Sequence, residues 1–118
     1  MIRHYILDGH KAVPCDFLTP TADGGFACDD EKFRLWGEAF HRDRHVAKTD
    51  IGKVHVSTVF LGLDHGYGGA ILLFETMIFG GEHDGYQERY STWEEAEVGH
   101  KQAVALVEGS SLEKAGAT

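Results

Sequence analysis

The chain is short of the features that mark several large classes of protein. Its 118 residues include two cysteines, Cys15 and Cys28, which form no Cys-x-x-Cys motif. No apolar run reaches the roughly 18 residues that a membrane-spanning helix needs. Two thiols make no disulfide framework, so we expect both to be small, partly buried side chains. Since there is no secretory signal either, the sequence predicts a reduced, soluble, cytosolic protein without membrane association.

Basic residues are also scarce. The chain has 11 Lys and Arg against 19 Asp and Glu, which gives a formal net charge of -8. The basic residues are scattered, so no basic stripe could follow a phosphate backbone, and direct binding of DNA or RNA is disfavoured. The acidic surface either serves solubility alone or meets a basic face on a partner protein.

Several catalytic and nucleotide-binding motifs are absent from the sequence. There is no His-x-x-x-His, no His-Glu-x-x-His and no paired-cysteine motif, and Ser57 has no nucleophile elbow around it. The glycines of residues 66–69 lack the following helix and Lys-Ser/Thr of a phosphate loop. The motifs therefore assign the chain to none of these enzyme classes.

What the chain does have is strong apolar patterning in its middle. Residues 54–63 and 70–79 are typical of two long strands, joined by a glycine-rich loop and apolar on both faces. Such strands need cover on both sides. Residues 2–7 and 12–15 predict an opening hairpin that turns at Asp8-Gly9-His10, and the Thr, Pro, Asp and Gly of residues 17–27 predict a mobile surface loop.

Two helices are predicted from capping residues and helical spacing. Asp29 or Asp30 can cap a helix over residues 30–42. Ser91-Thr92-Trp93-Glu94 fits a capping box that starts a second helix. The inner stripe of this second helix consists of Trp93, Ala96, Gly99 or His100, Ala103, Val104 and Val107.

Together these elements predict an α+β fold, an antiparallel sheet of five to six strands packed against two helices. We expect one domain over residues 1–108 and a disordered tail over residues 109–118, where little apolar surface is left to order the chain. Two helices of this length can cover one face of such a sheet but hardly two. A second copy of the chain is the simplest cover for the other face, so we predict a homo-oligomer.

Sequence blocks over nearly the whole chain up to Val107 resemble a family of small, mostly uncharacterised proteins encoded by bacteriophages and prophages. The blocks that carry the resemblance are Val13-Pro14-Cys15-Asp16, Arg44-His45-Val46-Ala47, Val56-Ser57-Thr58-Val59-Phe60-Leu61-Gly62-Leu63-Asp64-His65, Leu73-Phe74-Glu75-Thr76-Met77-Ile78-Phe79-Gly80-Gly81 and Tyr90-Ser91-Thr92-Trp93-Glu94-Glu95-Ala96 with Gly99-His100. The chain departs from the family pattern over residues 18–28 and at Ala70-Ile71. The resemblance implies a phage protein acting in the host cytosol, and it brings no particular activity.

The loop between the two central strands is the first candidate site. Asp64, His65, Gly66, Tyr67 and Gly68 combine an acid, an imidazole, an aromatic ring and backbone amides at the exit of a buried strand. Rigid strands that present such groups on a loop build many small-molecule sites. The alternative is a long turn in which the aspartate caps amides and the glycines only permit positive φ.

Glu75 and His100 are the second candidate site. Glu75 interrupts an apolar strand face, so it must be paired, hydrogen-bonded or protonated; it either serves a ligand or forms a structural pair with a group such as Arg89. His100 lies on the inner stripe of the second helix, where a satisfied core histidine is the commoner outcome. If Asp64, His65, Glu75 and His100 converged, they would make the mixed nitrogen and oxygen ligand set of a divalent Zn or Mn site.

Two functions from different classes follow. The first is a non-enzymatic phage accessory protein that counters host defence by binding, either a small nucleotide-like ligand or a host defence protein. With such a ligand Tyr67 would stack on a base, the loop amides would meet phosphate or ribose oxygens, and Arg89 would offset charge. The second is a small metal-dependent hydrolase or lyase that uses Asp64, His65, Glu75 and His100.

Overall fold

The structure is a computed structural model that describes residues 3–42, 44–64 and 69–116, with the backbone alone for residues 110–116. The described elements are, in chain order, β1 (Arg3–Asp8), β2 (Lys11–Pro14), β3 (Leu18–Pro20), β4 (Phe26–Cys28), α1 (Asp30–Phe40), β5 (His45–Ile51), β6 (Val54–Phe60), β7 (Leu63–Asp64), β8 (Phe74–Phe79), β9 (Gln87–Tyr90) and α2 (Trp93–Gly116).

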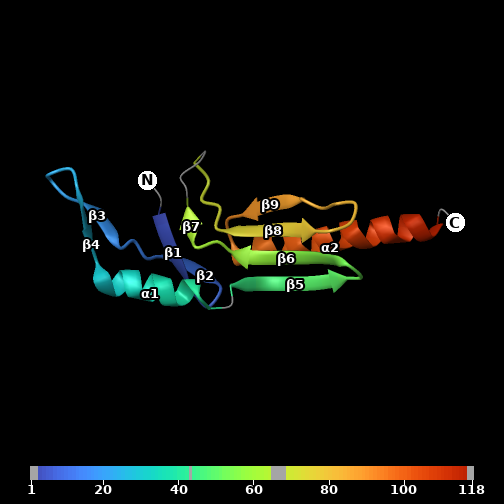
Figure 1. The fold of residues 1–118 in the computed structure, drawn as a ribbon, viewed down its shortest axis with the longest axis horizontal. Helices are drawn as coiled ribbons and strands as arrows, with labels where there is room; N and C mark the ends of the chain where they lie inside the picture. Colours follow the sequence, from blue (N-terminus) through green and yellow to red (C-terminus); the bar gives the residue numbers. More distant parts are fainter. Residues whose placement is uncertain (1–2, 43, 65–68, 117–118) are drawn as a thin grey trace.

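The largest layer is an antiparallel sheet in the order β5-β6-β8-β9, and α2 packs along one of its faces. In Figure 1, α2 passes behind this sheet and no other element crosses its front. Alternate residues of β6 point towards the helix, so Val56, Thr58 and Phe60 are buried. We call the opposite side, which no element of the described chain covers, the open face.

The inner stripe predicted for the second helix is confirmed in its central part. Ala96, His100, Ala103 and Val107 are all buried, and Val56 of β6 packs in the same core cluster as Ala103 and Val107. The spacing of three and four residues keeps these side chains on one side of the helix. The predicted capping box is shifted by one residue: the Thr92 hydroxyl accepts the Glu95 amide, and it also donates to the Glu95 carboxylate.

A second, smaller sheet has the order β2-β1-β7, and α1 packs against β1. The predicted opening hairpin is present, and Gly9 at its turn has a φ of 61°. Asp29 caps α1 by accepting the Lys32 amide, as the sequence predicts.

The α+β class is confirmed, but the prediction of one sheet of five to six strands is wrong. The described strands form sheets of three, two and four strands. The long strand predicted over residues 54–63 ends at Phe60, because Gly62 has a φ of 75° and turns the chain away from the four-stranded sheet. Leu63 and Asp64 then pair with β1 instead. The oligomer that was predicted from two apolar faces remains a prediction.

Residues 17–27, predicted as a loop, carry most of a small hairpin. β3 and β4 pair with each other, and Asp23 closes the turn by accepting the Gly25 amide. All residues of both strands are exposed, including Phe26 and Cys28, so only Cys15 of the two cysteines is buried. The sequence missed these strands because turn-forming residues dominate the segment.

The C-terminal part of the chain continues α2. The sequence predicts a disordered tail over residues 109–118, whereas the backbone of α2 is helical as far as Gly116. An existing helix extends at little cost per residue, which is why the weak sequence signal still permits it. Among the described residues, no helix is both long and apolar enough to cross a membrane.

Candidate functional site

The predicted loop site is described only at its two ends. His65, Gly66, Tyr67 and Gly68 lie outside the described residues. Asp64 is the last residue of β7 and stands opposite Arg3 of β1. The sequence prediction for this loop therefore stays a prediction.

Glu75 lies on the open face and is paired there. Its carboxylate accepts a hydrogen bond from Arg89 Nε at 2.8 Å and another from the Gln87 side-chain amide. Glu75 is 8% exposed, so this ion pair supplies the partner that a nearly buried carboxylate needs. The geometry matches the structural alternative considered from the sequence.

His100 is held on the other side of the sheet by two threonines. Its Nδ1 lies 2.7 Å from the Thr58 hydroxyl and its Nε2 lies 2.9 Å from the Thr49 hydroxyl. Thr58 also bonds Thr76, with 2.5 Å between the hydroxyl oxygens. Burial lowers the pKa of His100, so the neutral imidazole is favoured, and both of its ring nitrogens have partners. These contacts describe a satisfied core histidine.

Glu75 and His100 therefore do not share a site. Thr76, the neighbour of Glu75 on β8, points towards α2 and His100, so Glu75 points the opposite way. Asp64 belongs to the other sheet. In residues 3–42, 44–64 and 69–116 no group of three or more His, Cys, Asp or Glu side chains is placed to hold a metal ion. Asp64, Glu75 and His100 therefore do not converge to form the metal-ligand set that was considered from the sequence.

A hollow lies elsewhere, between the β1–β2 hairpin, residues 69–74 and the start of α2. We call it the hairpin cleft, and its volume is about 820 Å³. Its floor is apolar, with Tyr5, Leu73 and Phe74 among its lining residues. Gly69, at the far end of the glycine-rich loop, also lines it. A cleft of this size lies within the range of about 300–1,000 Å³ that small-molecule sites occupy.

An aromatic pair forms one wall of the hairpin cleft. The His10 imidazole stacks on the Trp93 indole with ring centroids 4.0 Å apart and planes only 5° from parallel. His10 comes from the turn between β1 and β2, and Trp93 opens α2. Phe74 meets the same indole edge-on, at a centroid distance of 6.2 Å, which helps to orient Trp93.

Polar groups of both signs surround this pair. Asp8 and Lys11 come from the hairpin, Ser91 and Thr92 immediately precede α2, and Glu94 lies in its first turn. The positive end of the α2 dipole lies at the same place, where it favours an anionic group. The cleft thus offers a flat apolar stacking surface, one lysine, hydroxyl groups and two carboxylates.

The sequence pattern indicates no role for His10, and it places Trp93 on the inner stripe of the second helix, as a core anchor first and a stacking platform second. The cleft draws on three segments that are far apart in the chain, so no local spacing could reveal it. Two local signals point towards the residues of the cleft wall. The Asp8-Gly9-His10 turn exposes His10, and the helix-capping residues immediately precede Trp93.

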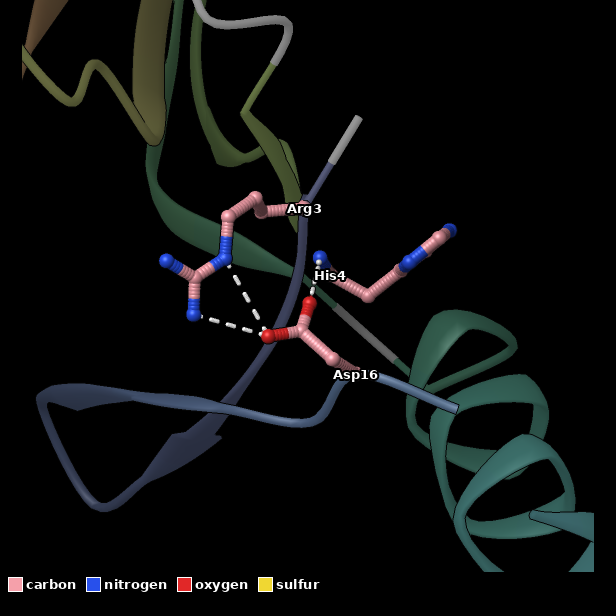
Figure 2. A network of polar contacts seen from close by, with 3 residues as sticks. All are labelled: Arg3, His4 and Asp16. Carbon is pink, nitrogen blue, oxygen red and sulfur yellow. Dashed lines mark hydrogen bonds and ion pairs between the residues drawn. The ribbon is translucent and has the colours of Figure 1, made fainter. Parts of the chain in front are cut away.

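A second polar cluster, drawn in Figure 2, has a structural role. Asp16 accepts from Arg3 Nη2 at 2.8 Å and Nε at 3.2 Å with one oxygen, and from the His4 amide at 2.9 Å with the other. Burial alone would raise the pKa of Asp16, but the His4 amide and the Arg3 guanidinium together hold it below its usual range. The carboxylate thereby ties the chain after β2 back to the start of β1.

Comparisons with protein-family models, with curated proteins and with solved structures found no match to this chain.

Proposed function

We propose that the protein is a binding protein that holds a small, planar, nucleotide-like ligand in the hairpin cleft without transforming it. The observation that carries this proposal is the His10–Trp93 stack in the wall of a cleft of about 820 Å³. An exposed, oriented aromatic surface binds the flat face of a base or a similar heterocycle, and such stacking contributes about 1–3 kcal/mol per base.

The polar groups of the cleft fit the remaining parts of such a ligand. Lys11 and the first turn of α2 favour a phosphate or another anion. The Ser91 hydroxyl can donate to ligand oxygens, while Asp8 and Glu94 can accept from amino or sugar hydroxyl groups. A ligand with both an anionic end and hydrogen-bond donors satisfies this mixture, whereas a purely polyanionic ligand would be repelled by the two carboxylates.

This proposal places the ligand in the hairpin cleft instead of the loop predicted from the sequence, but the kind of ligand, a nucleotide-like molecule, is the same. Arg89, expected to offset ligand charge, belongs to the Glu75 ion pair on the open face. Lys11 takes that role in the cleft. Binding is favoured over the metal-dependent hydrolase or lyase because Glu75 and His100, two of the four residues which that activity requires, lie on opposite faces of the sheet.

The biological setting of the proposal rests on the sequence blocks alone. Their resemblance to phage and prophage proteins supports an accessory role in the host cytosol, in which the protein sequesters a nucleotide-like signal of host defence. The acidic surface, with a net charge of -8, would support the other binding mode, a complex with a host defence protein that offers a basic face.

Tryptophan fluorescence can test the cleft directly. The chain has two tryptophans, so Trp36→Phe leaves Trp93 as the reporter and Trp93→Phe leaves Trp36 as the matched control. Each variant is titrated with nucleoside mono- and diphosphates and with cyclic dinucleotides, and thermal unfolding is recorded in parallel. We expect at least one of these to quench Trp93 and raise the melting temperature, and to be recovered chemically unchanged.

Replacing His10 sharpens this test. His10→Ala removes half of the stack, so we expect binding to weaken about tenfold or more, which corresponds to a loss of about 1.4 kcal/mol. The proposal fails if none of these nucleotides affects Trp93 or the melting temperature. It also fails if Trp36 responds as strongly as Trp93, or if the nucleotide is converted to a product.

A further inference from the structure

The open face of the four-stranded sheet carries charges in a fixed pattern, independent of the hairpin cleft. Its central row pairs Ser57 of β6 with Met77 of β8, both half-buried, and Lys48 of β5 stands beside Ser57. One row further on, Asp50 lies on the outer strand β5 and bonds His55. These side chains point away from α2, because Thr49 between Lys48 and Asp50 reaches His100 on the other side.

The opposite corner of the same face is also charged. Arg89 lies on the other outer strand, β9, beside Glu75 of β8, and Val59 of β6 completes their row. Because this row and the Asp50 row flank the Ser57–Met77 row, Asp50 and Arg89 occupy diagonally opposite corners of the face. Arg89 is held in place by its bond to Glu75, so its position is fixed before any partner binds.

We propose that a second copy of this chain covers the open face, with the two sheets packed face to face and their strands crossing at about a right angle. A two-fold axis along the diagonal that separates the charged corners puts Asp50 of each copy against the partner's Arg89. The same axis brings Lys48 close to the partner's Glu75 and places the Ser57–Met77 rows against each other. Orthogonal packing of two sheets is one of the two common arrangements.

The charges favour this arrangement over the other two-fold arrangements of these faces. An axis parallel to the strands places Arg89 over the partner's His45, which repels it when protonated, and Asp50 beyond the end of β9. An axis across the strands sets the Asp50 row over the Val59 row on the same strands, so Asp50 meets the partner's His45 and Arg89 meets no carboxylate of the described strands. The remaining diagonal axis places Asp50 against the partner's Asp50 and Arg89 against the partner's Arg89, which is repulsive.

The size of the face sets the expected strength of this dimer. Four strands about 4.8 Å apart and rising about 3.3 Å per residue give a footprint of roughly 400 Å² on each copy. This is about half of the roughly 800 Å² that each partner of a standard stable interface contributes. We therefore expect a weak, reversible dimer that weakens further as salt screens its charges.

Sedimentation velocity over a range from about 1 to 500 μM tests the association. Asp50→Arg sets a cation against the partner's Arg89, so we expect the dissociation constant to rise at least tenfold. Glu97→Arg makes the same charge change on the exposed side of α2 and serves as the control, with little effect expected. Circular dichroism confirms that both variants fold. A chain that stays monomeric throughout, or a dimer that Asp50→Arg leaves unchanged, overturns the proposal.

Cross-linking between variants that carry one exposed cysteine each, beside the buried Cys15, tests the orientation. In a Cys28→Ser background, which removes the exposed thiol, Asp50→Cys protein is mixed with Arg89→Cys protein and treated with a short bismaleimide. Packed sheets lie about 10 Å apart, so the mixture should give a mixed cross-linked dimer, while either protein alone gives little. Efficient cross-linking of the Asp50→Cys protein to itself, with no mixed dimer, would refute the crossed arrangement.

Discussion

Gly99 in α2 lies where a side chain has no room. A Cβ atom built on Gly99 would overlap the ring and the hydroxyl of Tyr90, well inside ordinary contact distance. Tyr90 ends β9 and packs against the core cluster that contains Phe74 and Ala96, so the ring has little freedom to move away. We therefore predict that Gly99→Ala destabilises the protein, contrary to the usual effect of this change within a helix.

The size of the effect follows from two opposing terms. Replacing glycine by alanine inside a helix is ordinarily stabilising by about 1 kcal/mol. Forcing an extra methyl group into a packed interface costs about 1–3 kcal/mol. Gly109 lies in the same helix with nothing within 4 Å of an added Cβ, so Gly109→Ala gives the helical term alone. The free energies of unfolding of the two variants should differ by about 1–3 kcal/mol.

Urea denaturation followed by circular dichroism measures this difference, and a double mutant assigns its cause. Tyr90→Ala removes the ring, so in that background Gly99→Ala should stabilise the protein as Gly109→Ala does. Tyr90→Phe should give no rescue, because the added Cβ also overlaps the ring carbons. If Gly99→Ala stabilises the otherwise unchanged protein as much as Gly109→Ala, the close approach of Tyr90 to α2 is refuted.

Three further predictions concern buried polar groups. The buried Tyr90 hydroxyl makes no hydrogen bond of ordinary geometry among the described residues, although Thr76 lies close enough to interact with it, so Tyr90→Phe should leave stability in urea unchanged or raise it by up to about 1 kcal/mol. Burial lowers the pKa of His100, so below about pH 6.5 the unfolded chain binds a proton at this residue more readily than the folded chain does. The free energy of unfolding should therefore fall as the pH drops below about 6.5, and His100→Gln should reduce this pH dependence. Burial also lowers the pKa of His4, so His4 accounts for the pH dependence that remains in the His100→Gln variant. If His100→Gln leaves the pH dependence of stability unchanged, His100 is not buried as described. Arg89→Met leaves the carboxylate of Glu75 without its cation and should cost about 1–3 kcal/mol in urea denaturation; a neutral result would show that Gln87 suffices.

Much of the fold could be predicted from local signals. The cap at Asp29, the turn at Gly9 and the inner stripe of α2 each depend on neighbours within a few residues, which spacing and composition report directly. The division into three sheets could not be predicted. It depends on the positive φ of Gly62, and a single glycine in a strand pattern does not reveal whether it bends the chain or merely weakens the strand.

The candidate site was harder to predict for a similar reason. Glu75 interrupts an apolar strand face, and the structure confirms that it is nearly buried and paired. Its partner Arg89 was among those considered from the sequence, because a buried carboxylate requires a partner. The alternation of side chains along a strand shows which residues share a face of the sheet. It does not show which of the two faces a helix covers, so only the structure reveals that Glu75 and His100 lie on opposite sides. The stack of His10 on Trp93 joins segments that are far apart in the chain, and the sequence contains no pairing signal for it.

The order of the strands along the chain has a consequence for how the protein folds. β5, β6, β8, β9 and α2 follow one another in sequence, so the large sheet and its helix can form from contacts within the C-terminal part of the chain. The pairing of Arg3 with Asp64 must close a loop of roughly 60 residues, which costs more chain entropy than a hairpin. We expect the N-terminal hairpin to dock late and to detach first, so its amides should exchange with deuterium through openings that leave β6 and β8 protected. Equal protection of both sheets would show instead that the molecule opens as one unit.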